Sequence, residues 1–308
     1  MINRPIYEKQ VDLLLKVLPL VIQESCFAIK GGTALNVFVR DLPRLSVDID
    51  LTYLPLNPRE QALTEIKKAL NRIKGRVIKH IPNVFITENH TKPEKHINRL
   101  FIKTPHAQIK IEPNFIMRGS VFPIQTLSLC QSAKDYFKQD IKDAPILSFA
   151  DLYAGKICAA LNRQHPRDLF DIKLLLENEG ITSDLLKATI VYLACDKRPM
   201  HELISPNIKQ NQETLFENEF NGMVMSKLSY DELSTVLPNL ITTLKKKFKE
   251  EEKEFLLSVA RGEPLWDLLD LPHLSELPAL RWRVENVKIM SDEKRVFTIH
   301  SLKEALEK

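Results

Sequence analysis

The sequence predicts an α+β fold in which strands gather in the N-terminal half and helices fill the C-terminal half. Residues 26–54 have the pattern of a buried strand, a glycine turn, a short helix and a second strand. Residues 76–116 contain four further stretches with strand character. Beyond about residue 140 the pattern becomes helical. We therefore expect two domains, over residues 1–140 and 141–308, in a chain long enough for two cores.

Each element follows from its own local pattern. Apolar residues on one side predict an amphipathic helix over residues 7–25. Asn57 followed by Pro58 predicts the start of a second helix, which we expect to end at Gly75. The remaining expected elements are strands at 77–81, 83–89, 96–104 and 107–115, an extended segment at 122–129, and helices at 149–164, 183–195, 230–261 and 277–308. The pattern changes to helical around residues 140–147, where we place the domain boundary.

Composition narrows the class of protein. The net charge of +4 and the pI near 8.7 permit an RNA or DNA partner without requiring one. Four cysteines are scattered without a C-x-x-C pair, so they indicate free thiols in a reducing compartment. No histidine stands in an H-E-x-x-H arrangement, and we assign no zinc site.

The N-terminus has neither the charge pattern nor the cleavage site of a secretion signal. Its most apolar stretch, Val11–Ile22, is interrupted by Lys16 and Pro19 and is too short to cross a bilayer. We therefore expect a cytoplasmic protein that has no membrane partner.

The glycine pair is the centre of the first motif. Lys30, Gly31, Gly32 and Thr33 follow an apolar run and precede a short helix over 34–39. Because glycine has no Cβ, backbone N–H groups in such a turn can approach a phosphate closely. The N-terminus of the helix adds a partial positive charge. The turn therefore predicts a phosphate-binding site.

Two carboxylates follow on the next strand. Strand alternation places Asp48 and Asp50 on one face and Val47, Ile49 and Leu51 on the other. Adjacent carboxylates repel each other unless a cation lies between them. Two carboxylates beside a phosphate suit Mg²⁺, which binds few protein carboxylates together with substrate phosphates. An isolated D-x-D is more often surface charge, but the preceding glycine turn favours a metal site.

A later strand carries the sequence Lys110-Ile111-Glu112. Lys110 and Glu112 share a face by alternation, and on their own they are typical of a surface charge pair. A third carboxylate could complete a metal site or accept a proton from an attacking hydroxyl.

The helical half contains one candidate constellation. Lys156 lies on the helix that follows Ser148, and Arg167, Asp168 and Asp171 lie on the next one. Spacing of i, i+4 between Arg167 and Asp171 is typical of a helix salt bridge worth a few tenths of a kcal/mol. The basic run at 245–249 is most simply a solvated helix face, and contact with an RNA backbone is the alternative.

Taken in order, these motifs resemble a known family. G-G-T-A-L, a basic loop and S-V-D-I-D-L resemble the nucleotidyltransferase core of the DNA polymerase β superfamily. The K-x-E motif and the order A-G-K-I to P-R-D-L-F-D-I resemble, more narrowly, the AbiEii/AbiGii nucleotidyltransferase toxins. The resemblance covers most of the chain.

The resemblance implies a fold and a set of catalytic residues. It implies an N-terminal catalytic domain, with a mixed β-sheet flanked by helices, and a helical C-terminal domain that contributes Lys156 and Asp171 to the cleft. The superfamily places its third carboxylate on a later antiparallel strand, a position that Glu112 fits. Asp48, Asp50 and Glu112 would bind Mg²⁺, with Mn²⁺ as the alternative. Lys156 would neutralise phosphate charge, and Asp171 would orient Lys156 or a substrate hydroxyl.

It also implies a nucleotide site, an acceptor and a partner. The residues implied to contact the NTP are Lys30, Gly31, Gly32, Thr33, Arg40, Arg44, Ser46, Lys110 and Arg167. The toxin relatives modify tRNA, typically at its 3′ end, and so block translation, which implies an RNA acceptor and an antitoxin encoded nearby. Two alternatives stay open: transfer to a protein or small-molecule hydroxyl, and a catalytically inactive fold that acts as a binding module.

Overall fold

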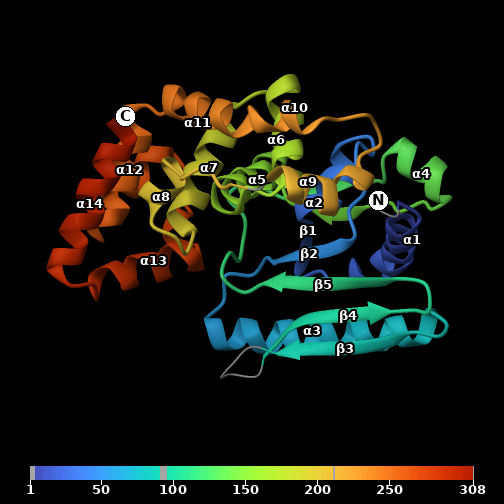
Figure 1. Ribbon diagram of the computed structural model, residues 1–308. Helices are drawn as coiled ribbons and strands as arrows, with labels where there is room; N and C mark the ends of the chain where they lie inside the picture. The colour runs from blue at the N-terminus through green and yellow to red at the C-terminus, as the bar shows by residue number, and fades with distance from the viewer. Residues whose placement is uncertain (1–3, 91–95, 211, 308) are drawn as a thin grey trace. The chain divides into compact units, whose positions relative to one another are not determined.

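The computed structural model describes residues 4–90, 96–210 and 212–307 (Figure 1). The chain forms two compact units. Unit 1 comprises Met1–Ser148 and Asn221–Lys227, and unit 2 comprises Phe149–Phe220 and Leu228–Lys308. Within the described residues all the strands belong to unit 1 and unit 2 is helical, so the predicted α+β class is confirmed.

Unit 1 is built on one mixed sheet with the strand order β3-β4-β5-β2-β1-β7-β6. Figure 1 labels β1 to β5 of this sheet. The strands are β1 Phe27–Lys30, β2 Asp48–Tyr53, β3 Phe85–His90, β4 Ile97–Lys103, β5 Gln108–Asn114, β6 Gln125–Leu127 and β7 Ala144–Ile146. β2 pairs with β5, and β1 with β7, in parallel; the other neighbours are antiparallel. The mixed sheet expected from the resemblance is therefore confirmed.

One expected strand direction is wrong. β5, which carries Glu112, runs parallel to β2, where an antiparallel strand was expected. The reason is the connection between them. A long helix and the β3–β4 hairpin intervene, and a crossover of this length can return the chain to the same end of the sheet.

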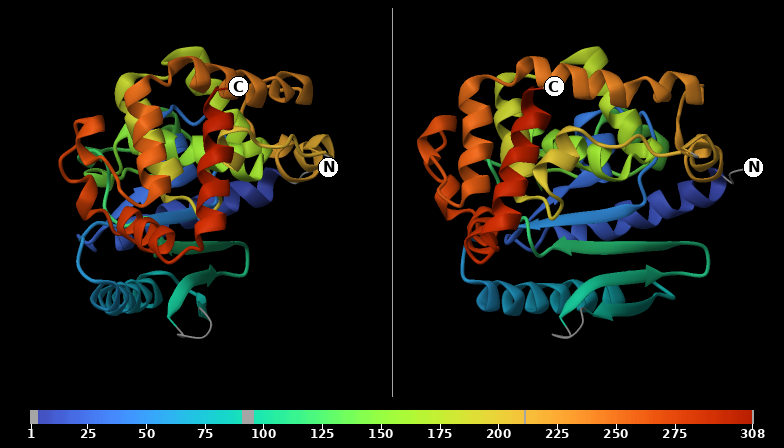
Figure 2. Two further views of the ribbon diagram at one scale, coloured as in Figure 1. Left: turned by 90° about the vertical axis from the view of Figure 1, so that its left-hand side faces the viewer. Right: turned by 60° about the vertical axis from the view of Figure 1, so that its left-hand side comes forward.

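The core of unit 1 lies between the sheet and two helices. α1 Arg4–Val21 and α3 Arg59–His80 both turn apolar residues inward, and α3 runs alongside β3 and β4 (Figure 2). On β2, Ile49, Leu51 and Tyr53 are buried, and the Tyr53 hydroxyl bonds to Glu65 of α3. The alternating residues therefore face away from α3, and these include Asp48 and Asp50.

The predicted end of the second helix is wrong. α3 continues past Gly75 to His80. Residues 77–80 of the strand that we expected at 77–81 are therefore helical. Ile66, Leu70, Ile73 and Val77 recur at helical spacing and are buried, so packing overrides the glycine. At the other end Asn57 does not cap the helix. Its side chain donates instead to Tyr53 and Glu65.

The change to a helical pattern was expected around residues 140–147, and that stretch contains a strand that we did not expect. Residues Ala144–Ile146 form β7, which pairs with both β1 and β6. Neighbouring strands on both sides satisfy its backbone groups, which local pattern cannot reveal. A short helix, α4 Gln131–Phe137, precedes it.

A segment from the C-terminal half returns to unit 1. Residues 223–225 pair with the loop before β2: Leu45 N–H donates to the Met223 carbonyl at 2.8 Å, and Met225 N–H to the Pro43 carbonyl at 3.0 Å. Arg44 forms an isolated bridge with Val224. Residues 223–225 therefore hold the loop that leads into D-x-D.

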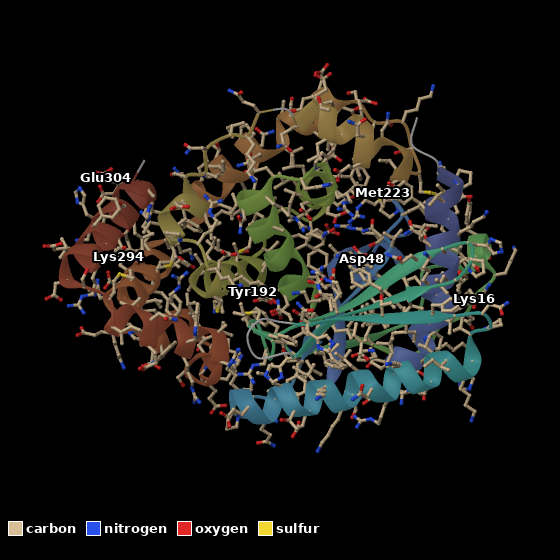
Figure 3. All side chains as sticks on the ribbon, turned by 60° about the horizontal axis from the view of Figure 1, so that its bottom comes forward. Lys16, Asp48, Tyr192, Met223, Lys294 and Glu304 are labelled. Carbon is tan, nitrogen blue, oxygen red and sulfur yellow. The ribbon has the colours of Figure 1, made fainter. Side chains whose placement is uncertain are left out.

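Unit 2 is a helical body. Its helices are α5 Phe149–Arg163, α6 Pro166–Asn178, α7 Ser183–Cys195, α8 Met200–Ile204, α9 Gln212–Glu219, α10 Tyr230–Ser234, α11 Val236–Lys247, α12 Glu250–Arg261, α13 Pro278–Lys288 and α14 Asp292–Glu307. α5 packs along α7, where the buried Tyr192 (labelled in Figure 3) donates to Asp151 at 3.1 Å. No helix in the described part of the chain is long and apolar enough to cross a membrane.

Two glycines with open space around them offer a matched test of the backbone. Gly75 lies mid-helix in α3, and Gly180 has φ +65°; an added Cβ would meet nothing within 4 Å at either. Gly75→Ala should raise the free energy of unfolding by about 0.5–1 kcal/mol, because alanine is the better helix former. Gly180→Ala should lower it by about 1 kcal/mol, because alanine disfavours positive φ. Urea denaturation of both variants measures these changes. A lower free energy of unfolding for Gly75→Ala would contradict the prediction.

Candidate active site

Three acidic residues lie on two adjacent strands of unit 1. Asp48 and Asp50 alternate along β2, and both are half-buried. In the parallel register with β5, Asp48 lies opposite Lys110 and Asp50 opposite Glu112. In the antiparallel register with β1, Lys30 lies opposite Asp50. The strands thus gather the D-x-D and K-x-E motifs and the first residue of the glycine turn (Figure 3 labels Asp48).

The glycine turn lies directly against Asp50. Gly31 has φ +72°, and a Cβ placed on it would lie 2.3 Å from Asp50 Oδ2. A Cβ on Gly32 would lie 2.8 Å from Ser46 Oγ and 2.9 Å from Arg44 Nη2. Any side chain would therefore displace these groups. The two glycines are needed for contact with the D-x-D strand and its preceding loop, in addition to any ligand.

The hydroxyl groups of this region are committed to the protein. Thr33 Oγ1 donates to the Asp48 carbonyl oxygen at 2.5 Å and lies 3.1 Å from Ser46 Oγ. Both side chains are buried. These hydrogen bonds connect the glycine turn to the start of β2. They fix the position of Asp48 along the strand relative to Gly31.

A basic pair neutralises Glu112. Arg99 of β4 donates from Nη2 to Glu112 Oε1 at 2.7 Å, and Lys110 Nζ lies 3.3 Å from Glu112 Oε2 and 3.4 Å from Asp48 Oδ2. Burial raises the pKa of Glu112, but the Arg99 hydrogen bond and the charge of Lys110 outweigh it, so the pKa lies below its ordinary value. The Glu112 hydrogen bond in turn raises the pKa of Arg99.

Arg99 is a residue that the sequence analysis missed. It lies in the stretch HINRLFIKT, and alternation places it on the opposite face from Leu100. Only the pairing of β4 with β5 brings it to Glu112, and strand pairing is not written in the local pattern. A lone arginine on a strand gives no signal of this role.

The two arginines before D-x-D differ in position. Arg44 is only 2% exposed and donates from Nη1 to the Leu45 carbonyl oxygen at 2.9 Å. Its guanidinium lies against Gly32, and its backbone belongs to the loop that pairs with residues 223–225. Arg40 is half-buried and follows the π-helix η1 Leu35–Val39. Arg44 therefore packs against the glycine turn inside the protein, and Arg40 is the more solvent-accessible of the two arginines.

The carboxylates suit a metal that completes its coordination with substrate. In the described part of the chain no three His, Cys, Asp or Glu side chains converge as a preformed metal cluster. Glu112 is held by Arg99 and Lys110 instead. Mg²⁺ needs only one or two protein carboxylates when phosphate oxygens and water supply the rest. Asp48 and Asp50 supply the two carboxylates that such a Mg²⁺ site needs. They lie beside a turn in which Gly31 has room for no side chain.

A second charged cluster lies within unit 2. Lys156 Nζ lies 3.1 Å from Asp168 Oδ1 and 2.8 Å from Asp171 Oδ2, and all three side chains are buried. Arg163 adds two hydrogen bonds to Asp168, at 2.5 and 2.9 Å. Burial raises the pKa of Asp168, but the charge of Lys156 and the Arg163 bonds lower it far more strongly, so the net pKa is well below its ordinary value.

This cluster differs from the simplest sequence interpretation. Asp171 pairs with Lys156, not with Arg167 one helical turn away. Arg167 is half-buried, and its side chain forms no ion pair with a described residue. Asp168, to which the sequence analysis gave no role within the candidate constellation, and Arg163, which it missed, are the other half of the cluster. The i, i+3 spacing of the two aspartates was the available signal.

The chain is similar in fold and in sequence pattern to known nucleotidyltransferase toxins. A solved structure, MenT4, the nucleotidyltransferase toxin Rv2826c from Mycobacterium tuberculosis H37Rv, aligns with a TM-score of 0.60 over 93% of this chain and 99% of that chain, at 13% identity. No curated protein sequence matches the chain. The family model for the nucleotidyl transferase AbiEii toxin, Type IV TA system, matches residues 12–286.

These findings define the protein as a nucleotidyltransferase. The chain belongs to the AbiEii family of nucleotidyltransferase toxins of type IV toxin–antitoxin systems. The resemblance on which the sequence analysis relied is therefore confirmed. The family implies a nucleotide substrate and an antitoxin partner.

Asp168 should dominate the stability of its cluster. Asp168→Asn keeps the shape but removes a buried charge that faces two cations, and we expect a loss of about 3 kcal/mol in the free energy of unfolding at pH 7. Glu177→Gln, which breaks the exposed pair with Lys173, is the control and should cost less than 1 kcal/mol.

The same variant has a defined pH dependence. A carboxyl with a depressed pKa stabilises the fold fully above its unfolded pKa, about 3.9, and loses that stabilisation as the pH falls. The difference between the wild type and Asp168→Asn should therefore shrink below about pH 4. Chemical denaturation across pH 3–7 measures it, and an unchanged difference would contradict the assigned pairing.

Proposed function

We propose that this protein transfers a nucleoside monophosphate from an NTP to RNA, at the 3′ end of tRNA, with Mg²⁺ as the cofactor. The observation that carries the proposal is the contact between Asp50 and the Gly31 turn. This contact places the Asp50 carboxylate, a candidate metal ligand, next to the backbone of the glycine turn, a candidate phosphate ligand. A nucleotide bound there would meet both at once.

The nucleotide would be held mainly by the glycine turn. Backbone N–H groups of Gly31 and Gly32 can approach phosphate oxygens closely because no Cβ intervenes. Lys30, opposite Asp50 in the register, and the half-buried Arg40 are the cations assigned to the triphosphate. Thr33, Ser46 and Arg44 support the turn through their buried contacts.

Mg²⁺ held by Asp48 and Asp50 would neutralise phosphate charge and polarise the α-phosphate. The acceptor hydroxyl oxygen then forms a bond to the α-phosphorus, the bond to the bridging oxygen breaks, and pyrophosphate leaves. The ionised Glu112 is assigned to accept the hydroxyl proton at Oε2. Its lowered pKa keeps it unprotonated at neutral pH, and Arg99 holds it in place through Oε1.

Lys156 is the cation assigned to neutralise phosphate charge. The 2.8 Å pair between Lys156 and Asp171 supports the predicted role of Asp171 in orienting that lysine. Arg167, with no ion pair to a described residue, is assigned to a phosphate. Membership of a toxin family and the mildly basic charge support an RNA acceptor over a small molecule.

A labelling experiment tests the reaction and the acceptor together. The purified protein is incubated with Mg²⁺, each radiolabelled NTP in turn and total tRNA. Label should enter tRNA, and Asp48→Ala should reduce the rate at least 100-fold, because catalysis depends on positioning and charge neutralisation. Asp12→Ala, an exposed acid on α1, is the control and should keep full activity.

Two results would contradict the proposal in different ways. Label that enters protein or a small molecule, but not tRNA, would show that the acceptor is wrong. An Asp48→Ala variant as active as the wild type would show that the catalytic site is wrong.

A further inference from the structure

A buried arginine without a counter-ion lies in unit 1, in the turn that follows β5. Arg118 is only 6% exposed. Its Nη1 donates to the Asn57 carbonyl oxygen at 3.0 Å, but its Nε is buried without a hydrogen-bond partner. No carboxylate among the described residues forms an ion pair with it. A buried charge in this state is costly unless an anion joins it.

The surroundings of Arg118 are electropositive. Burial lowers the pKa of Arg118, the charge of Arg59 lowers it further, and Tyr53 opposes them. The Glu65 carboxylate is engaged elsewhere: it accepts hydrogen bonds from the Tyr53 hydroxyl, from Gln61 at 2.9 Å and from Asn57 at 3.1 Å. The exposed Glu60, in the first turn of α3, is the other acid on this helix end.

The start of α3 adds backbone N–H donors beside the guanidinium. The cap position, Pro58, provides no side-chain hydrogen bond, and the first helical bond runs from Ala62 N–H to the Pro58 carbonyl at 2.9 Å. The N–H groups that precede Ala62 in the helix have no acceptor within it. α3 is 22 residues long, and its N-terminus carries a partial positive charge. The bond from Arg118 to Asn57 places the guanidinium at this same end.

We propose that Arg118, Arg59 and the N-terminus of α3 bind a phosphate group at a site separate from the carboxylates of β2. A planar guanidinium fork matches phosphate oxygens. Asn57 Oδ1 is also buried without a partner, and it can accept a hydrogen bond from a protonated phosphate oxygen. A carboxylate ligand would offer no such donor at neutral pH.

The two sites lie at opposite ends of the parallel strand pair. Asp48 begins β2, whereas Arg118 follows the end of β5, which runs parallel to β2. Asn114 holds the intervening turn, since its Oδ1 accepts from the N–H groups of Ile116 and Met117 at 3.0 Å. The phosphate site therefore does not depend on the proposed function. Its ligand is either a free phosphate, including the terminal phosphate of a nucleotide, or the backbone phosphate of a nucleic acid.

Thermal unfolding of the full chain with inorganic phosphate tests the site. Arg118→Met keeps an unbranched apolar stem and removes the charged guanidinium, and in chloride buffer it should be at least as stable as the wild type. Phosphate at matched ionic strength should raise the Tm of the wild type in a concentration-dependent way, and it should raise the Tm of Arg118→Met markedly less. Acetate should raise neither.

Three results would overturn the proposal. Equal phosphate responses of the wild type and Arg118→Met, or no response of either, would exclude Arg118 as a phosphate ligand. An acetate response as large as the phosphate response would exclude the phosphate class. If Arg118→Met does not fold, the phosphate affinity of Arg59→Gln tests the proposal instead. Arg59 is exposed, and this variant should raise the phosphate dissociation constant at least fivefold; an unchanged constant would overturn the proposal.

A second arm separates the two sources of phosphate. The affinity of a labelled single-stranded RNA is measured for the wild type and for the variant used above. A loss of RNA affinity that parallels the loss of the phosphate response identifies a backbone phosphate. An unchanged RNA affinity, with the phosphate response lost, identifies a free phosphate.

Discussion

The close contact between Asp50 and the Gly31 backbone is the constraint on which the candidate active site depends. The virtual Cβ at 2.3 Å from Asp50 Oδ2 leaves room only for hydrogen, and the positive φ of Gly31 independently favours glycine. β1 and β2 must therefore pair in one register for the turn and the carboxylate to fit. That register also sets the positions of Lys30 and Asp48 along their strands. The parallel register of β2 with β5 places Lys110 opposite Asp48 and Glu112 opposite Asp50.

Charge balance explains why acidic groups can lie so close together in both units. In unit 1, Lys110 lies between Asp48 and Glu112, and Arg99 holds the far side of Glu112. In unit 2, Lys156 lies between Asp168 and Asp171. The unit 1 group stays half-buried. The unit 2 group is almost fully buried, so its pairs also contribute to the stability of the helical body.

Much of the fold could be predicted from the sequence because its signals are local. The glycine turn, the alternation of D-x-D and K-x-E, and the apolar stripe of α1 each depend on a few neighbouring residues. What could not be predicted depends on distant partners. β7 is a strand because β1 and β6 lie beside it, and α3 passes Gly75 because Val77 packs in the core. Arg99, Arg163 and Asp168 joined their clusters through strand pairing and helix packing, and residues 223–225 reached the Arg44 loop from the other half of the chain.

The most direct test of the account is the affinity of the protein for nucleotide, measured by isothermal titration with each NTP, with and without Mg²⁺. The account predicts that Mg²⁺ strengthens binding by the wild type, and that Gly31→Ala weakens it at least tenfold by displacing Asp50 from the turn. Gly75→Ala, the same change in the exposed face of α3, should bind as the wild type does. A Gly31→Ala variant that binds NTP as tightly as the wild type would contradict the central claim.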